Sequence, residues 1–191
     1  MTKTIENIHV TAIVRNIQKR TLLAKESMEY ANTVVNAIKN AIKNNSSEVK
    51  INSDEWSYTV YKKEQFEEVL STFKDSGEKF KDNYTRYIKD LENIKDGKKI
   101  SQKTKQLLKN KYQSLLDNEI NNINVFTDEL NGIKSKYEQG EIDCNGWIKY
   151  KSVSIKDTYY DRFIEKHTEY ISKSKDSVVV LTDKLSALKS M

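Results

Sequence analysis

The sequence predicts a mainly α-helical fold: an elongated, coiled-coil-like, antiparallel up-down-up-down four-helix bundle with two short β-hairpins at one end. First, the 191 residues include no Pro and five Gly, where average usage would be roughly 5% Pro and 7% Gly. Second, 37% of residues are hydrophobic and 32% are charged, a balance that suits slender helices with solvated outer faces. Third, an apolar stripe near the start of the chain continues over several heptads.

The first expected helix runs from about residue 4 to residue 43. All but one of the positions in its stripe are apolar, so the helix should bury this seam against a partner of similar length. The stripe alternates steps of four and three residues and comprises Val10, Val14, Ile17, Thr21, Ala24, Met28, Ala31, Val35, Ile38 and Ile42. The polar residues 44–47 are typical of a helix end.

The period then changes to two, which indicates a first β-hairpin at about 48–60. Val49 and Ile51 alternate with polar residues, and Trp56, Tyr58 and Val60 do so again after a turn at 52–55. A four-residue loop would place Ile51 opposite Trp56 and Val49 opposite Tyr58. These four side chains should then share one face.

Two further helices follow. The stripe of the second comprises Phe66, Leu70, Phe73, Gly77, Phe80, Tyr84, Tyr87, Leu91 and Ile94, and Gly97 suits the left-handed position after a helix end. Ser101 is a reasonable N-cap for the third helix, which should stop at Gly140. The stripe of the third is less regular and comprises Leu108, Tyr112, Leu115 or Leu116, Ile120, Ile123, Phe126, Leu130, Ile133 and Tyr137.

A second hairpin is expected at about 141–155, because Asn145-Gly146 is the preferred pair for a type I′ turn. Cys144 would face Trp147 across that turn, in a small apolar role. Asp157 can cap the fourth helix, which carries a stripe of Tyr160, Ile164, His167, Ile171, Ser174, Val178, Leu181, Leu185 and Leu188.

The order of elements predicts a single elongated helical domain over 1–191, with pseudo-repeat halves 1–96 and 97–191. Short connections make neighbouring helices antiparallel, which would gather both hairpins at one end. The candidate partner-binding residues at this tip are Trp56, Tyr58, Trp147, Ile148 and Tyr150, since Trp and Tyr are favoured binding anchors. The alternative is that the hairpins close the bundle with their Trp rings buried.

Two other surfaces are candidates. A basic patch without acidic neighbours comprises Lys98, Lys99, Lys103, Lys105, Lys109 and Lys111, and such a patch attracts phosphate or an anionic membrane surface; the alternative is a solvated helix start.

In mid-helix, Thr21, Gly77, Glu119 and Ser174 should lie at similar height, where they would set the register or line a ligand pocket.

No metal, cofactor or catalytic site is expected. Glu6 and His9 have the spacing of a di-iron motif, but a second such pair is missing around His167. Cys144 has no His nearby in the sequence, and Gly-rich phosphate loops are absent. The residues therefore favour a protein that is not an enzyme.

The main functional hypothesis is a non-catalytic interaction protein that presents its aromatic hairpin tip to a protein partner. One alternative is a leaderless exported protein that acts at membranes or as a secretion partner, toxin-like in outline. Nucleic-acid binding through the basic patch is less favoured, and a homo-oligomer would use leftover apolar stripe. Neither a signal peptide nor a membrane span is predicted, so the compartment is cytoplasmic or reached by a leaderless route. Richness in Lys, Asn and Ile suggests an AT-rich bacterial or phage genome.

Overall fold

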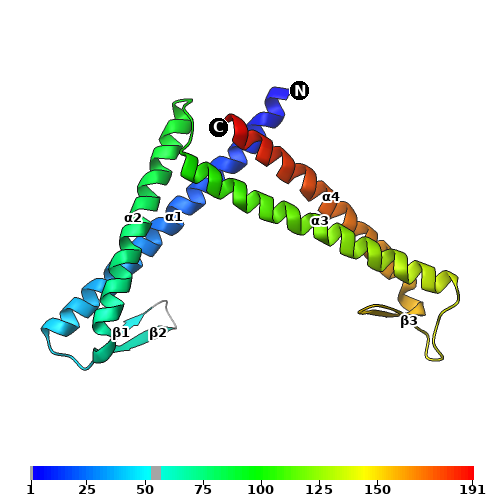
Figure 1. Cartoon of the computed structure of the whole chain (residues 1–191), viewed down its shortest axis with the longest axis horizontal. Helices are drawn as coiled ribbons and strands as arrows, with labels where there is room; N and C mark the ends of the chain where they lie inside the picture. The colour runs from blue at the N-terminus through cyan, green and yellow to red at the C-terminus, as the bar shows by residue number, and fades with distance from the viewer. Residues whose placement is uncertain (1, 53–56) are drawn as a thin grey trace. The chain divides into compact units, whose positions relative to one another are not determined.

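The computed structural model describes residues 2–52 and 57–191 (Figure 1). These residues form four α helices and two two-stranded antiparallel sheets, which confirms a mainly α fold with two short hairpins. In order the elements are α1 (Thr2–Lys43), β1 (Glu48–Asn52), β2 (Tyr58–Lys62), α2 (Phe66–Lys95), α3 (Gln102–Glu138), β3 (Trp147–Tyr150), β4 (Val153–Lys156) and α4 (Tyr160–Ser190). A short 3₁₀ turn precedes each of α2 and α4, at η1 (Lys63–Gln65) and η2 (Asp157–Tyr159).

The chain divides into two compact units. The α1–α2 unit comprises residues 11–104 with Met191, and the α3–α4 unit comprises residues 1–10 and 105–190. In each unit a β-hairpin connects two long helices and lies where the first helix ends and the second begins (Figure 1). Each unit thus builds its own core at the junction of helix pair and hairpin.

In the α1–α2 unit, the predicted stripe of α1 faces inward along most of its length. Ile17, Ala31 and Ile38 are buried, and a Cβ atom added to Gly77 of α2 would lie 3.5 Å from Ala31 Cβ. The stripe fails at its last position, since Ile42 is 47% exposed whereas Ala41 is buried. An α helix turns by 3.6 residues rather than 3.5, so a strict heptad pattern drifts by about 20° per repeat.

The hairpin β1–β2 covers the core of this unit. Ile51 packs in one buried cluster with Val34 and Ile38 of α1 and with Phe66 at the start of α2. Phe73 joins the cluster from α2 and meets the ring of Tyr61 edge-on at 6.5 Å. The hairpin therefore closes the end of the helix pair with Ile51 and Tyr61, whereas the plug predicted as an alternative uses the Trp rings.

The predicted register of this hairpin is wrong. Val49 pairs with Tyr61 and Ile51 pairs with Thr59, so the loop is longer than expected and the second strand is shifted by three residues. An odd shift moves each side chain to the other face, which leaves Tyr58 on the outer face and places Tyr61 inward. Trp56, the predicted partner of Ile51, lies outside the described residues.

The α2–α3 connection is held by a buried carboxylate. Asp90 is 1% exposed, and its oxygens accept hydrogen bonds from Ser101 N (2.6 Å) and Ser101 Oγ (2.9 Å). Ser101 Oγ in turn accepts from Thr104 N at 3.4 Å, which places Ser101 at the N-cap position as predicted. At the end of α2, the N–H groups of Gly97 and Lys98 donate to carbonyls of the last turn, as in a Schellman motif.

The α3–α4 unit has buried residues at its hairpin end. Ile133 and Ile148 are fully buried, and the rings of Tyr137 and Tyr160 stack with centroids 3.8 Å apart. Further along, His167 of α4 stacks on Phe163 and its Nε2 lies 3.3 Å from Glu129 of α3. At the far end, His9 lies 3.5 Å from Asp183.

The predicted turn of the second hairpin is wrong. The strands pair Trp147 with Lys156 and Tyr150 with Val153, so the tight turn lies at Lys151, which has φ 51°. Asn145 and Gly146 do form a turn, but it precedes the hairpin. Asp143 captures the N–H groups of Asn145 and Trp147 there, and a side chain that bonds forward to the backbone favours such a turn over a hairpin. Cys144 is exposed rather than packed on Trp147.

The ends of α1 and α3 are built alike. The left-handed residue is Asn45 (φ 51°) after α1 and Gly140 (φ 69°) after α3, and both helix ends show the paired backbone bonds of a Schellman motif. Seven residues earlier, Ile38 and Ile133 are both fully buried. The two helix–hairpin–helix units thus share an architecture.

Candidate functional site

The candidate site is an aromatic groove on the β3–β4 hairpin. Trp147 begins β3 and pairs with Lys156 at the end of β4, whose Nζ lies 5.7 Å from the centre of the indole ring. With Ile155 and Tyr159 these residues line a groove of about 400 Å³. Trp147 is 36% exposed and Tyr159 is 58% exposed, so both rings present apolar surface to solvent beside a cation. We call this surface the hairpin groove.

Buried neighbours hold the hairpin groove in place. Ile148, next to Trp147, is fully buried. On the same strand, the Tyr150 ring lies so close to Gly132 of α3 that a Cβ atom there would overlap it. The Tyr150 hydroxyl lies 3.1 Å from Asp128. The hairpin is therefore anchored on α3 by one face while the Trp147 end stays at the surface.

Two carboxylates bind groups of this hairpin: Asp143 binds backbone N–H groups, and Asp128 binds the side chains of Tyr150 and Lys151. Asp143 Oδ1 accepts hydrogen bonds from the Trp147 and Asn145 N–H groups, both at 2.9 Å, and Oδ2 lies 3.1 Å from Lys149 Nζ. The bond from Trp147 N–H and the neighbouring Lys149 hold the pKa of Asp143 below its usual value. Lys151 lies 2.8 Å from Asp128 and lowers the pKa of that carboxyl.

The five predicted tip residues fall into different environments. Trp147 is at the surface, whereas Ile148 is buried and Tyr150 is half-buried against α3. Tyr58 belongs to the other hairpin, is 56% exposed, and lies under Lys50 Nζ at 3.4 Å. Trp56 lies outside the described residues. The sequence analysis missed Tyr159, because a residue in the short turn before a helix follows neither a helical nor a strand period.

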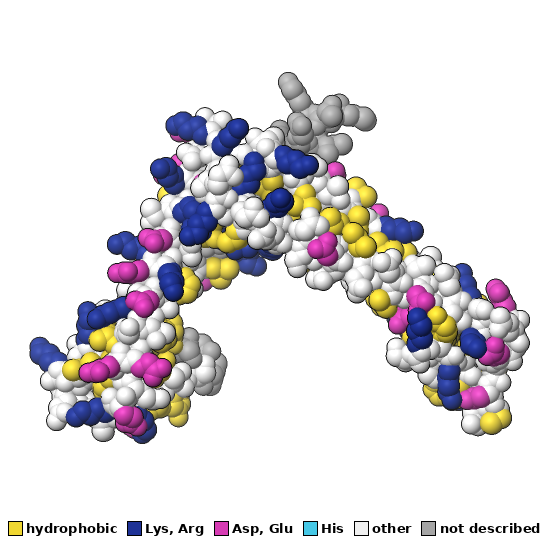
Figure 2. All heavy atoms as spheres, in the orientation of Figure 1, with side chains coloured by type: hydrophobic (Ala, Val, Ile, Leu, Met, Phe, Trp, Pro, Cys, Tyr) yellow, Lys and Arg dark blue, Asp and Glu magenta, His cyan; other side chains and the backbone are white. Residues whose placement is uncertain are grey.

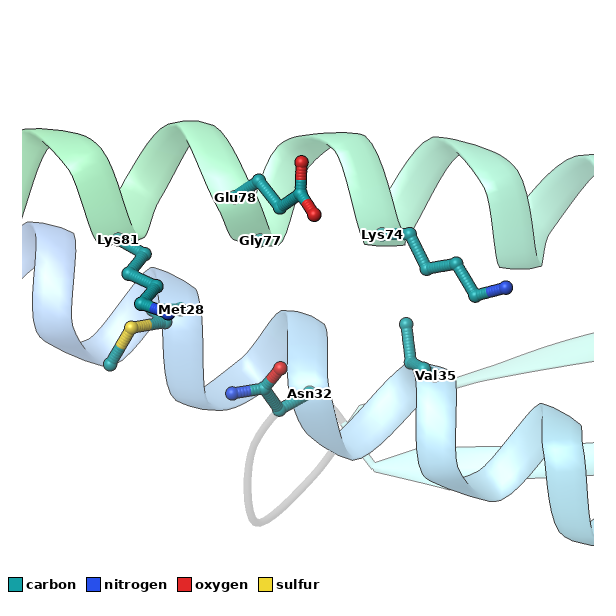
Figure 3. A pocket seen from close by; sticks show the side chains of 7 residues that line it. All are labelled: Met28, Asn32, Val35, Lys74, Gly77, Glu78 and Lys81. Carbon is teal, nitrogen blue, oxygen red and sulfur yellow. The ribbon is translucent and has the colours of Figure 1, made fainter.

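A second groove follows the α1–α2 seam at mid-helix. Gly77 leaves a space of about 430 Å³ between the helices (Figure 3). Met28, Asn32 and Val35 line it from α1, and Lys74, Glu78 and Lys81 line it from α2. Gly77 was predicted to line a pocket or set register, and it does border a groove. Thr21 instead turns its hydroxyl to Ile17 O at 2.9 Å, and Glu119 and Ser174 belong to the other unit.

The six lysines of the predicted basic patch are not equivalent. Lys98 Nζ lies 3.1 Å from Asp96, and Lys105 Nζ donates to the carbonyl of Lys189 in the last turn of α4 at 3.1 Å. Lys99, Lys103, Lys109 and Lys111 are exposed. On the face drawn in Figure 2, basic and acidic side chains are interspersed over the helices of the α1–α2 unit near its hairpin.

Comparisons with known proteins add no relative. The chain matches no family model, and searches of curated proteins and of solved structures found no match. Over the described residues, none of the helices combines the length and apolarity that a membrane crossing requires. Within the same residues, no three His, Cys, Asp or Glu side chains gather in a way that could hold a metal ion.

Proposed function

We propose that this chain is a non-catalytic interaction protein that presents the hairpin groove to a protein partner. The observation that supports the proposal is the exposure of Trp147 and Tyr159 in the lining of a groove that also contains Lys156. Trp and Tyr are enriched among the residues that dominate protein interfaces, because they bury a large area with few rotatable bonds.

The chemistry of the groove favours an apolar or aromatic partner side chain with a carboxylate beside it. The two rings supply apolar walls, and the Lys156 ammonium lies 5.7 Å from the centre of the indole ring. Around this hairpin, Asp143 and Asp128 already pair with Lys149 and Lys151, and Asp157, the residue after Lys156, accepts from the Thr158 N–H at 2.7 Å. A partner carboxylate would therefore meet Lys156 without displacing an existing ion pair.

Substitution of Trp147 tests the proposal. The full-length protein would be immobilised and used to capture partners from a lysate of its source organism. We expect Trp147→Ala to reduce recovery of the specific partner about tenfold or more, because truncating a central anchor costs about 2 kcal/mol of binding free energy. The matched control is Tyr170→Ala, which removes an aromatic ring that is 43% exposed on α4.

Three results would contradict the proposal. Equal capture by wild type and Trp147→Ala would show that the indole is no anchor. Loss of helicity in both Trp147→Ala and the milder Trp147→Phe would assign the ring to the plug that closes the unit. Dye leakage from anionic vesicles that depends on Trp147 would instead favour the membrane-acting alternative.

Nucleic-acid binding is less well supported. Lys98 and Lys105 already have partners within the chain, which leaves fewer lysines to neutralise phosphates. Affinity for a duplex that falls steeply with salt, and falls again in a Lys99→Gln and Lys103→Gln variant, would favour it over the protein partner.

A further inference from the structure

Arg20 of α1 carries a hydrogen-bond donor that the described residues leave unsatisfied. Its Nε atom is shielded from solvent and has no hydrogen-bond partner there, although the side chain as a whole is only half-buried. A guanidinium donor removed from water without a partner costs free energy, and more so because the group is charged. A ligand that accepts from this group would recover that cost.

A groove of about 160 Å³ lies beside Arg20 on the α1–α2 seam. Its walls are mainly apolar, with Leu23 from α1 and Phe80 and Tyr87 from α2. The polar groups that line it are the Ser27 hydroxyl and the Asn83 side chain. All of these residues lie within the α1–α2 unit.

Of the described residues that line this groove, Arg20 is the only charged one. The Arg86 guanidinium lies beside the groove: its Nη2 donates to Asn83 Oδ1 at 2.8 Å, its Nε donates to Thr104 Oγ1 at 3.2 Å, and its Cζ lies 4.9 Å from the centre of the Tyr87 ring. Because Asn83 Oδ1 already accepts this bond from Arg86, the Asn83 side chain would bind a ligand through its amide N–H groups. A cationic lining residue with hydroxyl and amide donors beside it matches an anionic acceptor.

We propose that the Arg20 groove binds a carboxylate carried on a short apolar stem. The carboxylate accepts from the exposed edge of the guanidinium, and a rotation of the flexible Arg20 side chain lets Nε–H donate to the second oxygen in a forked pair. Ser27 and Asn83 supply further donors, and the stem packs between Leu23, Phe80 and Tyr87. A phosphate dianion fits less well, because the walls are mainly apolar and Arg20 is the one cation among the described residues that line the groove.

The test follows the Arg20 Nε–Hε signal of the full chain by NMR while sodium butyrate is added at constant ionic strength. We expect a saturable shift with a dissociation constant in the millimolar range, as befits so small a ligand. Arg20→Gln should weaken butyrate binding about tenfold or more, measured on the backbone amides of Phe80 and Asn83. Arg15→Gln is the matched control, because Arg15 is exposed on the same helix. The affinity of this variant for butyrate should equal that of the wild type.

Further measurements show which part of the ligand is recognised and whether the carboxylate comes from a protein or a free acid. Arg20→Lys keeps the charge but lacks the fork, so it should bind butyrate more weakly than wild type and more tightly than Arg20→Gln. 1-Butanol lacks the carboxylate and should not bind. A capped peptide with one Glu between two Leu that binds more tightly than butyrate would identify a protein side chain as the natural source, and weaker binding would identify a free acid.

Three outcomes would overturn the proposal: no saturable shift with butyrate, equal affinity in Arg20→Gln, or tighter binding of inorganic phosphate than of butyrate. These outcomes are independent of the hairpin groove. Trp147→Ala should leave butyrate binding unchanged, and Arg20→Gln should leave partner capture unchanged.

Discussion

At the scale of single residues, two helical glycines have opposite surroundings. Gly77 of α2 faces Ala31 with room for one more methyl group, whereas Gly132 of α3 lies against the ring of Tyr150. The intrinsic cost of Gly in a helix interior is about 1 kcal/mol relative to Ala. Comparing Ala substitutions at the two positions therefore distinguishes the effect of helix propensity from that of packing.

We expect Gly77→Ala to stabilise the protein by about 0.5–1 kcal/mol, because helix propensity improves and the added Cβ makes an ordinary contact. Gly132→Ala should destabilise it by about 1–3 kcal/mol, because the Cβ forces the Tyr150 ring and β3 to move. Urea unfolding measures both. In a Tyr150→Ala background the penalty of Gly132→Ala should disappear; a penalty that persists would locate the strain elsewhere.

At the scale of elements, the α2–α3 connection depends on Asp90. Asp90→Ala leaves the Ser101 N–H buried without its acceptor, so we expect a loss of about 1–3 kcal/mol in the free energy of unfolding. Asp90→Asn keeps one acceptor oxygen and should lose less. Ser101→Ala retains the backbone bond to Asp90 but removes the N-cap hydroxyl, so it measures the hydroxyl's share of the loss separately. Wild-type stability of Asp90→Ala at neutral pH would show that the connection is held by other contacts.

The β3–β4 hairpin should give the protein an acid-sensitive element. The pKa of Asp143 is lowered by the Trp147 N–H and Lys149, and that of Asp128 by Lys151 and Tyr150. A carboxyl with a lowered folded-state pKa contributes stability above its unfolded pKa of about 3.9 and loses that contribution as pH falls through its folded pKa. Asp143→Asn should flatten the decline in stability below pH of about 4. An unchanged pH profile would show that this carboxyl is not coupled to folding.

The elements also show which features a sequence can predict. The heptad stripe of α1 identified the buried seam, because a long regular helix converts spacing directly into direction. The hairpin turns were not predictable in the same way. Asn145-Gly146 fits a hairpin turn and an Asp-initiated turn equally well, and Asp143 decides between them. Lys151 adopts positive φ with no residue-type signal, since lysine does not favour that conformation.

The candidate site was predicted in part, for a related reason. Trp147 was identified by its residue type and its position after a turn. Ile148 and Tyr150 were assigned to the same surface, but strand alternation sends Ile148 inward and the proximity of Gly132 draws Tyr150 onto α3. No local sequence pattern predicts the contact between this hairpin and α3, because the two segments are separate in the chain. The Arg20 groove also has no motif, because its lining comes from two separate helices.

At the scale of the whole molecule, the two helix–hairpin–helix units repeat one plan with little shared sequence. The buried positions Ile38 and Ile133 stand at the same distance before their left-handed residues, Asn45 and Gly140. Each lies beneath a hairpin that supplies one buried isoleucine, Ile51 or Ile148. The plan thus rests on a helix end, a two-stranded hairpin and a buried strand isoleucine.

This correspondence predicts equal energetic roles. We expect Ile38→Ala and Ile133→Ala each to lower the free energy of unfolding by about 2–5 kcal/mol, the usual range for a large-to-small change at a fully buried site. Exposed Ile42→Ala and Ile120→Ala, with 47% and 44% exposure, are the controls and should cost little. A large difference between the free-energy losses of the two buried substitutions would mean that the units share an arrangement of elements but not equally stabilising cores.

Because Trp147 lies at the surface, its intrinsic fluorescence can report binding at the hairpin groove. The sequence has two tryptophans, so a Trp56→Phe variant leaves one indole as the sole strong fluorophore. Its emission should lie between that of a solvated and a buried ring, and iodide should quench it readily because Lys156 attracts the anion toward it. A blue shift with loss of quenching would then report occupancy of the groove in real time, without any label.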